Sequence, residues 1–559
     1  MILRLSRNRA FYPDERYYER EVTRWAEVVA SVGGHVRQIS SLDDLARLRP
    51  DELLVLPEAP CLSGIEIQAI RTHLRRGGSL VSNWAVGARD ARCNWRGWQT
   101  VAEFSGAHDV RELARRDGLY FTVPGGLPLS PGLDPGTRVE LRPEPTLALN
   151  QPGARVYWSD WALNPAPDEA GGTSDVAATV GKTPAGGRIA WFGFHLSQAS
   201  TPRDSLNVYR MVQNGVRWGA GVPMASVAAW PDGRRAALVL VQDVEAEHRN
   251  ALALAKLLKE LSLPGSFYAV SGLVKDDPEL AEALSEAGEI GSHSADHRPV
   301  AGLALDDQRN ILRREWGEIR GWAGEGPAGF RPPEESFDAN TLRAWAESGG
   351  RYVIATNQAR SGSPEVHGSG RDQMILLPRL MKDDYNVFVQ DGALKADRLT
   401  EAFLEGARKI RAVGGLAIAA LHTQIAGTGS RLQAVRALAD TTRANQDWWT
   451  ARADEVADWW RVRSSIVVRF LAPADSDSGV GPEIVVEGPR GDDIEGLWLD
   501  IVLPNGADDV RPTVNGSAVA FTVTEWGIRV PVGRLPAGGE RLVAIRSSST
   551  SVLADPEGS

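Results

Sequence analysis

Two histidines four residues apart, His293 and His297, are the residues whose spacing in this sequence most directly suggests chemistry. They lie in the segment GEIGSHSADHRPV (288–300), directly after a short apolar stretch. In a helical turn this spacing places both imidazoles on one face, where they can bind one metal ion. Because such a pair is also typical of hydrogen-bonded surface histidines, the interpretation depends on the residues that accompany it.

Two carboxylates near an apolar segment could complete a metal site. A hydrolytic metal ion needs about three protein ligands and an open position for water. The turn Asp243-Val244-Glu245 follows the segment AALVLV and offers both a third ligand and a base for the activated water. The sequence leaves open which of Asp243 and Glu245 has which role, and Asp243 is equally typical of a helix cap.

Three more polar residues would assist such a site. Arg331 precedes two prolines that stiffen its backbone, and its guanidinium would keep a neighbouring base ionised or form a structural salt bridge. His422 follows the apolar segment LAIAAL and would protonate a leaving amine. Asp391 would pair with His422 and raise its pKa, although an Asp-Gly dipeptide is also typical of a turn.

The pattern of apolar segments predicts the domains that position these residues. Residues 223–462 repeat strands and helices, which predicts a (β/α) barrel of eight strands or one fewer, with functional residues at the carboxyl ends of the strands. Residues 1–222 predict a doubly wound α/β domain with a parallel sheet. Residues 463–548 predict a β-sandwich, followed by a disordered tail at 549–559. The fold class is therefore α/β, with the barrel flanked by two other domains.

Composition limits the partners and the compartment. The 559-residue chain has a net charge of −10, so it lacks the basic excess that binds nucleic acid. It has no apolar run long enough for a transmembrane helix, and its first residues do not form a signal peptide. We therefore expect a cytoplasmic protein, or a secreted one whose leader precedes this sequence. Cys61 and Cys93 can form at most one disulfide.

The order of these motifs resembles the polysaccharide deacetylases of the NodB-homology type, carbohydrate esterase family 4. The resemblance covers about 234–425 and rests on HSADH at 293–297 together with FRPPEESFDANTL at 330–342. It implies a distorted (β/α) barrel, a divalent metal ion such as zinc, and an N-acetylated polysaccharide or oligosaccharide as the partner. The roles that it implies are His293 and His297 as metal ligands, Asp243 as the base, Arg331 as its support, Asp391 as the residue that tunes His422, His422 as the acid, and Leu421 as the wall of the acetyl pocket.

Three departures from the family pattern affect the site. The family usually has two adjacent aspartates, one as the base and one as a metal ligand. The corresponding residues here are Asp243-Val244, so one of these two roles passes to Glu245. The usual aromatic residue after Arg-Pro-Pro is Glu334, whose backbone amide would still bind an oxyanion and whose side chain would change the substrate pocket. Leu421 directly precedes His422, so the apolar wall would be displaced.

The first domain resembles a different fold. Its segments ELLVLPEAP and HLRRGGSLVSNW are similar to the class I glutamine-amidotransferase-like fold. Active members of that fold have a cysteine on the turn after the strand at 79–82. That turn is Asn83-Trp84-Ala85 here, so the resemblance implies a non-catalytic domain.

Together these features predict a metal-dependent N-deacetylase, a hydrolase that removes acetyl groups from an amino-sugar polysaccharide. One alternative is a metal-dependent hydrolase of a small, non-peptide C–N substrate, because Glu334 and Glu335 would suit a cationic or polar molecule. A second alternative is a glycan-binding protein without activity. Metal analysis of the purified protein would separate that alternative from the two enzymes.

Overall fold

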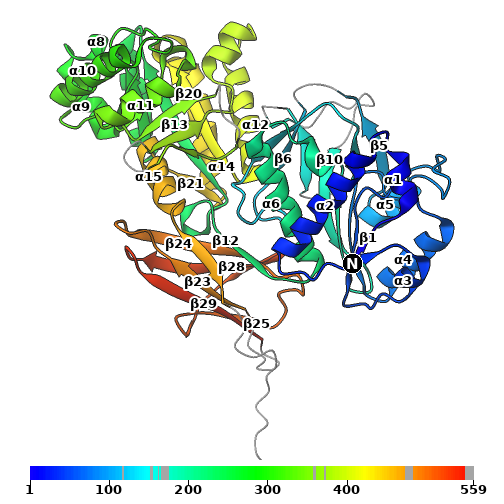
Figure 1. Ribbon diagram of the computed structural model, residues 1–559. Coiled ribbons are helices and arrows are strands. Elements are labelled where there is room, and N and C mark those ends of the chain that lie inside the picture. The colour runs from blue at the N-terminus through cyan, green and yellow to red at the C-terminus, as the bar shows by residue number, and fades with distance from the viewer. Residues whose placement is uncertain are drawn as a thin grey trace, which may run out of the picture.

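The chain folds into three parts, each with a large hydrophobic core of its own (Figure 1). The computed structural model describes residues 1–115, 119–151, 155–160, 163–164, 175–356, 361–369, 373–471 and 482–547. The predicted tail at 549–559 lies outside these residues. The blue and cyan N-terminal part lies beside the green and yellow middle part, and the orange and red C-terminal part lies below the middle part.

The N-terminal part contains a mixed sheet, so the prediction of a parallel sheet is correct for only part of it. The parallel strands follow the order β2 (Gln38–Ile39), β1 (Ile2–Leu3), β3 (Leu53–Leu56), β4 (Ser79–Asn83) and β11 (Arg188–Phe192). Antiparallel strands extend the sheet through β10 (Asp175–Lys182), β9 (Val156–Ser159), β6 (Leu119–Val123) and β7 (Thr137–Leu141), with β8 (Thr146–Asn150) and β5 (Asp109–Leu113) beside them. A parallel pair needs a long crossover, usually a helix, whereas the strands from β5 to β9 are not separated by helices.

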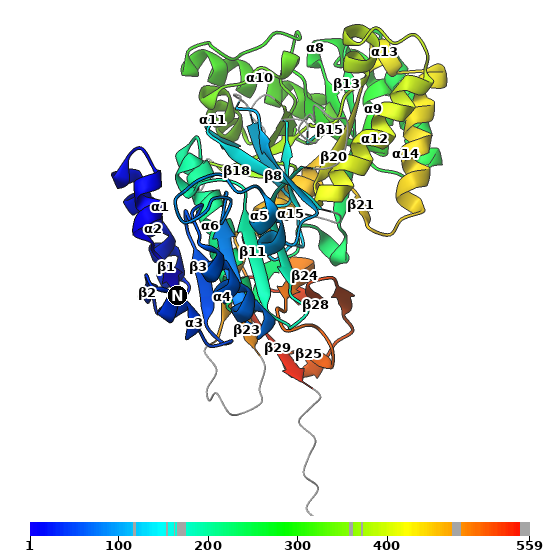
Figure 2. The same ribbon diagram turned by 90° about the vertical axis from the view of Figure 1, so that its right-hand side faces the viewer.

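Helices cover both faces of the parallel strands. Alternate residues of β3 belong to different cores, Val55 to one and Leu54 to the other. The helices α2 (Glu15–Ser31) and α6 (Pro202–Gly219) pack against the first core, and α4 (Gly64–Arg75) and α5 (Gln99–Ser105) against the second. The short helices α1 (Ser6–Phe11) and α3 (Leu42–Ala46) precede α2 and β3 (Figure 2).

The end of β4 has no thiol. Asn83 and Trp84 occupy this position, and Trp84 has a left-handed backbone with φ of 46°. Cys93 forms a disulfide with Cys61, across a sequence separation of 32 residues. The side chain of Asn83 instead donates a hydrogen bond of 2.7 Å to the buried carboxylate of Glu58. No free cysteine is therefore present for nucleophilic catalysis in this domain.

The middle part contains the predicted strand–helix repeat. Its strands follow the order β20 (Leu416–His422), β13 (Ala236–Val244), β14 (Gly265–Ala269), β15 (Gly288–Ser292), β16 (Gly329–Phe330), β17 (Tyr352–Ala355) and β19 (Met374–Pro378), and all of these neighbours are parallel. The strand β18 (Glu365–His367) adds an antiparallel edge, and β21 (Trp448–Thr450) pairs with β13. Within the described residues no pairing joins β20 to β18 or β19, so hydrogen bonds do not close the barrel.

Helices surround this sheet on its outer side. They are α7 (Ala251–Glu260), α8 (Ser271–Val274), α9 (Pro278–Ala287), α10 (Leu305–Ala323), α11 (Ala339–Ser348), α12 (Asp397–Val413), α13 (Thr423–Ala426) and α14 (Gln433–Arg443). Leu238 and Leu240 of β13 pack outward against α7 and α12, whereas Val239 and Val241 pack inward. This alternation, which follows from the period of two in a strand, separates an outer core from the barrel interior.

Two tyrosines fill the barrel interior below the strand ends. The hydroxyls of Tyr268 and Tyr352 are 2.5 Å apart, and both rings are fully buried. Gly291 and Gly329 lie against these rings, where a Cβ atom at either position would overlap the aromatic carbons. The interior at this level is therefore a packed core and not a pore.

The C-terminal part consists of two sheets that face a shared apolar core. One sheet follows the order β12 (Met224–Val227), β24 (Ile494–Val502), β28 (Gly527–Leu535) and β27 (Thr522–Thr524). The other follows β22 (Val467–Phe470), β23 (Glu483–Glu487), β29 (Glu540–Ser547), β25 (Val510–Val514) and β26 (Ser517–Ala518). Since β12 pairs with β24, residues 224–227 belong to this sandwich and not to the middle domain predicted to begin at 223.

The helix α15 (Ala453–Arg463) joins the middle and C-terminal parts. Trp460 packs into the interior core of the middle part, with its ring 5.2 Å from that of Trp230. Val462, two residues later, belongs to the core of the sandwich. The side chain of Arg463 donates to the carbonyl oxygens of Val227 and Ala228, so the start of the sandwich is held against this helix.

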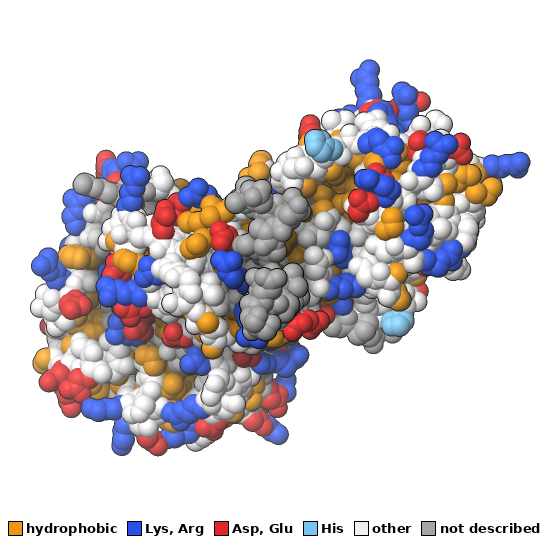
Figure 3. Space-filling view, turned by 90° about the horizontal axis from the view of Figure 1, so that it is seen from below, with side chains coloured by type: hydrophobic (Ala, Val, Ile, Leu, Met, Phe, Trp, Pro, Cys, Tyr) orange, Lys and Arg blue, Asp and Glu red, His pale blue; other side chains and the backbone are white. Residues whose placement is uncertain are grey.

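The surface carries mixed charge. Seen from below, Lys and Arg side chains alternate with Asp and Glu over the visible face (Figure 3). None of the described helices combines the length and apolarity needed to cross a lipid bilayer.

Candidate active site

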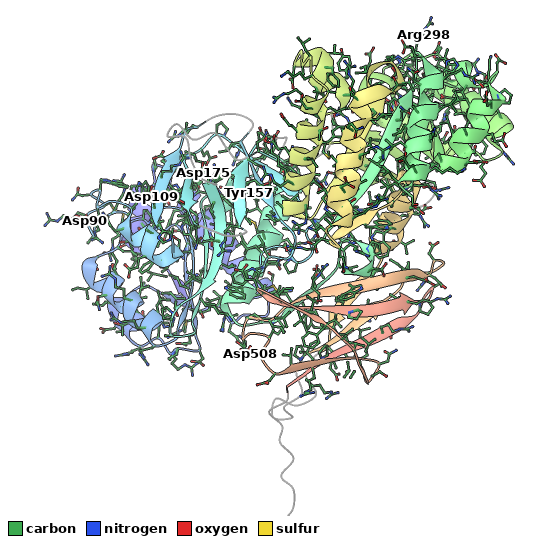
Figure 4. The ribbon with its side chains drawn as sticks, turned by 180° about the vertical axis from the view of Figure 1, so that it is seen from behind. Asp90, Asp109, Tyr157, Asp175, Arg298 and Asp508 are labelled. Atoms are coloured by element: carbon green, nitrogen blue, oxygen red, sulfur yellow. A yellow bond between two sulfur atoms is a disulfide. The ribbon has the colours of Figure 1, made fainter. Side chains whose placement is uncertain are left out.

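Most of the predicted site residues meet at the carboxyl ends of the strands of the middle part. Asp243 is opposite His422 in the register of β13 and β20. The backbone N–H of His293 donates to Ala269 (2.9 Å), and that of Arg331 donates to Ser292 (2.9 Å), which continues the pairing beyond the strands. Arg298, which follows His297 closely, lies at the end of the middle part farthest from Asp508 of the C-terminal part (Figure 4). The site therefore faces away from the sandwich.

Strand alternation directs these side chains inward. Asp243 and His422 each lie two residues beyond a strand residue of the interior core. His293 and Arg331 each lie two residues beyond a glycine that contacts an interior tyrosine. Because residues two apart share a face of a strand, all four side chains project over the barrel interior.

The two histidines converge on one carboxylate oxygen. The Nε2 atoms of His293 and His297 lie 2.8 and 2.9 Å from Oε1 of Glu245. The prediction that a helical turn presents this pair is wrong, because β15 ends at Ser292 and His297 has a left-handed φ of 60°. The chain instead turns back on itself, and the rings are 5.0 Å apart.

This cluster has the donor set of a divalent cation site. Nδ1 of His293 lies 2.5 Å from the carbonyl oxygen of Arg331, which can only accept, so Nδ1 carries the proton. Nε2 is therefore the ring nitrogen of His293 that faces Oε1 of Glu245 and the ligand atom that the ring offers at this site. Ligand atoms of Glu245, His293 and His297 all lie within 4.8 Å of one another. These residues therefore fit a metal bound by two imidazoles and one carboxylate.

The environment of Glu245 favours its ionised form. Burial acts to raise the pKa of this carboxyl group, but the hydrogen bonds with His293 and His297 outweigh it and lower the pKa well below its usual range. The same bond with Glu245 raises the pKa of His297. The side-chain amide of Gln424 donates to Oε2 of Glu245 and orients the carboxylate. A preorganised carboxylate of this kind is suited to a metal ligand.

Asp243 forms an ion pair with Arg331 at the same rim. Nε of Arg331 donates to Oδ2 of Asp243 (2.6 Å), and both side chains are almost completely buried. Although burial acts to lower the pKa of Arg331, the charges of Asp243 and Glu335 raise it further above its usual range. The other oxygen of Asp243, Oδ1, is buried and has no hydrogen-bond partner among the described residues. Asp243 therefore has one oxygen fixed by an arginine and one available as a proton acceptor.

His422 is oriented by Asp384, and the prediction that Asp391 has this role is wrong. Nδ1 of His422 lies 2.6 Å from Oδ1 of Asp384, and the backbone N–H of His422 donates to Oδ2 (2.8 Å). Asp391 is exposed and pairs with Lys382 (2.6 Å), because it lies beyond the turn that follows β19. Burial acts to lower the pKa of His422, but Asp384 and Asp243 raise it to about 9.

Two predicted substrate contacts have different surroundings. Leu421 is buried in the outer core among helix residues, so its predicted place in the pocket wall is wrong. The reason is the alternation of β20, which directs His422 inward and Leu421 outward. Glu334 is exposed and has a left-handed φ of 55°. Its charge contributes to the raised pKa of His297, so its side chain lies on the same side of the site.

Comparison with known proteins agrees with this geometry. Residues 233–353 match the family model of polysaccharide deacetylases. The match identifies a polysaccharide deacetylase domain within the chain. It includes Asp243, Glu245, both histidines and Arg331, and it confirms the predicted resemblance for that part of the range. No curated protein matches the chain.

Several solved structures are similar to a part of the chain. One is a Mycobacterium smegmatis protein described as a polysaccharide deacetylase, with 24% identity and a TM-score of 0.38 over 42% of this chain and 92% of that chain. Another is PuuE allantoinase, with 19% identity and a TM-score of 0.37 over 42% and 92% of the two chains. A third is a family 4 carbohydrate esterase from Streptomyces lividans in complex with acetate, with 17% identity and a TM-score of 0.28 over 40% and 93%. The resemblance of residues 1–222 to an amidotransferase-like fold stays a prediction.

Sequence reasoning missed several residues around the candidate site. Asp384 follows the strand segment MILLP in the run Lys-Asp-Asp-Tyr, so its position at a strand end was a usable signal. Glu315 of α10 accepts a hydrogen bond from Ser292, directly before His293. Burial raises the pKa of Glu315 to about 8. No sequence motif indicates Glu315, because its contact depends on how α10 packs against β15.

Proposed function

We propose that the deacetylase domain is a metal-dependent N-deacetylase that removes acetyl groups from an N-acetylated amino-sugar polymer. The observation that carries the proposal is the arrangement of three adjoining groups at one rim: a His-His-Glu cluster, an Asp–Arg pair and an Asp–His pair. The cluster would hold the metal ion, the Asp–Arg pair would provide the general base, and the Asp–His pair would provide the general acid that amide hydrolysis requires. The family match over 233–353 supports the same reaction class.

His293, His297 and Glu245 would hold the metal ion through two Nε2 atoms and one carboxylate. When bound, a divalent cation supplies Lewis acidity, which polarises an acyl oxygen and lowers the pKa of a water molecule. Zinc suits a mixed nitrogen and oxygen donor set. The hydrogen bond from His293 to the Arg331 carbonyl and the one from Gln424 to Glu245 would keep these ligands oriented.

Asp243 is suited to act as the general base. Its Oδ1 atom has no partner among the described residues and can accept the proton of the attacking water. Arg331 binds the other oxygen and holds the carboxylate in one orientation. These contacts favour Asp243 as the base and Glu245 as the ligand, one of the two alternatives that the sequence left open.

His422 is suited to act as the general acid. Its pKa of about 9 keeps the imidazole protonated near neutral pH, and Asp384 binds the Nδ1 proton. Nε2 is then the proton donor. It lies 3.4 Å from Oδ2 of Asp243, so it belongs to the edge of the ring that faces the base. It can protonate the amine as the C–N bond breaks. The backbone N–H of Glu334 is the candidate donor to the developing oxyanion.

A polymeric substrate is consistent with where the rim lies. The site faces away from the C-terminal part, and the side chain of His297 is 42% exposed (Figure 4). We infer that a chain-like substrate can reach the rim without meeting the sandwich.

Acetate release tests the proposal directly. The protein should release acetate from N-acetylhexosamine oligomers, lose this activity with a chelator and regain it when Zn²⁺ is restored. A small amide such as N-acetylglucosamine or a ureide should be a much poorer substrate. Folded, zinc-loaded protein that releases no acetate from any oligomer would count against the proposal.

A further inference from the structure

Glu335 lies at the centre of a network of charged side chains beside the candidate active site. It accepts hydrogen bonds from Nη1 of Arg331 (3.3 Å) and Nε of Arg379 (2.5 Å). It also accepts from the backbone N–H of Thr356 (3.2 Å) and from the Thr356 hydroxyl. Burial acts to raise its pKa, but the two arginines lower it to about 2. Glu335 is therefore an ionised, largely buried acceptor for several donors.

These donors come from three neighbouring strands of the sheet. Arg331 follows β16, Thr356 follows β17 and Arg379 follows β19. Glu335 reaches all three because the chain turns back after Arg331, where Glu334 and Glu335 both have left-handed φ values, 55° and 53°. Such backbone persists where surrounding contacts determine it, and it is common at functional sites.

Arg379 continues the network to the segment that carries Asp384. Its Nη1 atom donates to the carbonyl oxygen of Met381 (2.8 Å) and pairs with Asp383 (3.2 Å). Asp383 in turn accepts from the backbone N–H of Asn386 (2.8 Å), which closes the turn around Asp384. Arg379 is only 7% exposed, so its guanidinium is a fixed anchor for this turn.

The contacts form a closed ring that passes through both the base and the acid. Each neighbouring pair in the ring is joined by an ion pair or, between positions 383 and 384, by the backbone. In order, the members are Asp243, Arg331, Glu335, Arg379, Asp383, Asp384 and His422, which returns to Asp243. Glu335 and Arg379 are the members that connect the side of the base to the side of the acid.

We propose that Glu335, together with Arg379, is a positioning residue that sets the orientation of the Asp243 and His422 side chains relative to each other. This inference rests on the proposed function. Glu335 fixes Arg331 relative to Arg379. Arg331 then orients the base, while Arg379 holds the turn from which Asp384 orients the acid. Without the Glu335 carboxylate, two buried guanidiniums would lose their shared counter-ion, and neither turn would be held relative to the other.

The test is a double-mutant cycle with Glu335→Gln, Arg379→Gln and the double variant. We expect each single variant to lower kcat for acetate release by about 10- to 100-fold, with KM changed by less than about twofold, because the contact orients reacting groups. The double variant should be no slower than the slower single variant, because both changes break one link. Circular dichroism and thermal melting verify that each variant is folded.

Glu347→Gln is the matched control. Glu347 also accepts from two arginines, Arg309 (2.6 Å) and Arg343 (3.0 Å), but it lies between α10 and α11 on the outer surface. This variant should keep the kcat of the wild type. A kcat loss equal to that of Glu335→Gln would overturn the inference, as would multiplicative effects in the double variant or a rise in KM alone.

A second readout does not depend on activity. In chelator-treated protein, the Nδ1 proton of His422 bound to Asp384 should give a low-field proton resonance. We expect it to shift or broaden in Glu335→Gln and Arg379→Gln and to stay unchanged in Glu347→Gln. A wild type without acetate release would refute the proposed function, whereas an unchanged resonance in both ring variants would refute the positioning role.

Discussion

The pairing of His422 with Asp384 leads to a prediction that distinguishes two aspartates. His422 has a pKa of about 9 against an ordinary value of about 6.5. The difference of about 2.5 units corresponds to about 3 kcal/mol in favour of the protonated imidazole. The side chain of His422 is 13% exposed, so solvent screens little of this interaction. Asp384 supplies the shortest contact, at 2.6 Å, and its charge should account for about 1–3 of these units.

The perturbation is Asp384→Asn, compared with Asp391→Asn as the matched control. In chelator-treated protein, histidine NMR titration should give a pKa near 9 for His422 in the wild type. It should fall by about 1–3 units in Asp384→Asn. It should change by less than about 0.3 units in Asp391→Asn, because Asp391 is exposed and pairs with Lys382.

The stability of the protein should change with the same sign. Because the pKa of His422 is raised on folding, its stabilising effect is complete below about pH 6.5 and disappears as the pH rises through 9. The difference in free energy of unfolding between the wild type and Asp384→Asn should therefore decrease over that range. A pKa of His422 that moves in Asp391→Asn but not in Asp384→Asn would refute this account of the acid.

Three further predictions concern other parts of the molecule. Glu245→Gln should lower the zinc content of the purified protein by more than about tenfold, measured by mass spectrometry, whereas Glu347→Gln should not. Reduction of the Cys61–Cys93 disulfide, which closes a loop of 32 residues, should destabilise the N-terminal part by about 4 kcal/mol in denaturant titrations, and an unchanged midpoint would contradict this. Glu315 has a pKa raised by burial to about 8, so the unfolded chain loses this proton from about pH 4.5 and the folded chain only near pH 8. Stability should fall by up to about 5 kcal/mol between these values, and Glu315→Gln should remove this pH dependence, as shown by thermal melts at pH 5 and pH 9.

The sequence by itself determined the location of most of the site. Apolar segments predicted the strands, and polar residues directly after them predicted a cluster at one rim. Asp243, Glu245, Arg331 and His422 lie there because the carboxyl ends of parallel strands meet at one edge of the sheet. The cap of α4 also follows from a local pattern, because Ser63 and Glu66, three residues later, form the reciprocal hydrogen bonds of a capping box.

Alternation within a strand was also present in the sequence, although the pocket prediction did not use it. Leu421 is adjacent to His422, and residues adjacent in a strand face opposite sides. The structure accordingly buries Leu421 against the helices. The sequence also contained the short connection between Lys182 and Arg188, which makes β10 and β11 of the N-terminal sheet antiparallel.

Only the tertiary structure decided which charged groups contact one another. Asp384 and Asp391 are both acidic residues near the end of β19, and the path of a short turn places one against His422 and the other against Lys382. The choice of Glu245 as the partner of both histidines depends on the left-handed turn at His297. Long-range contacts of this kind join residues separated by tens of positions or more, and local propensity carries no information about them.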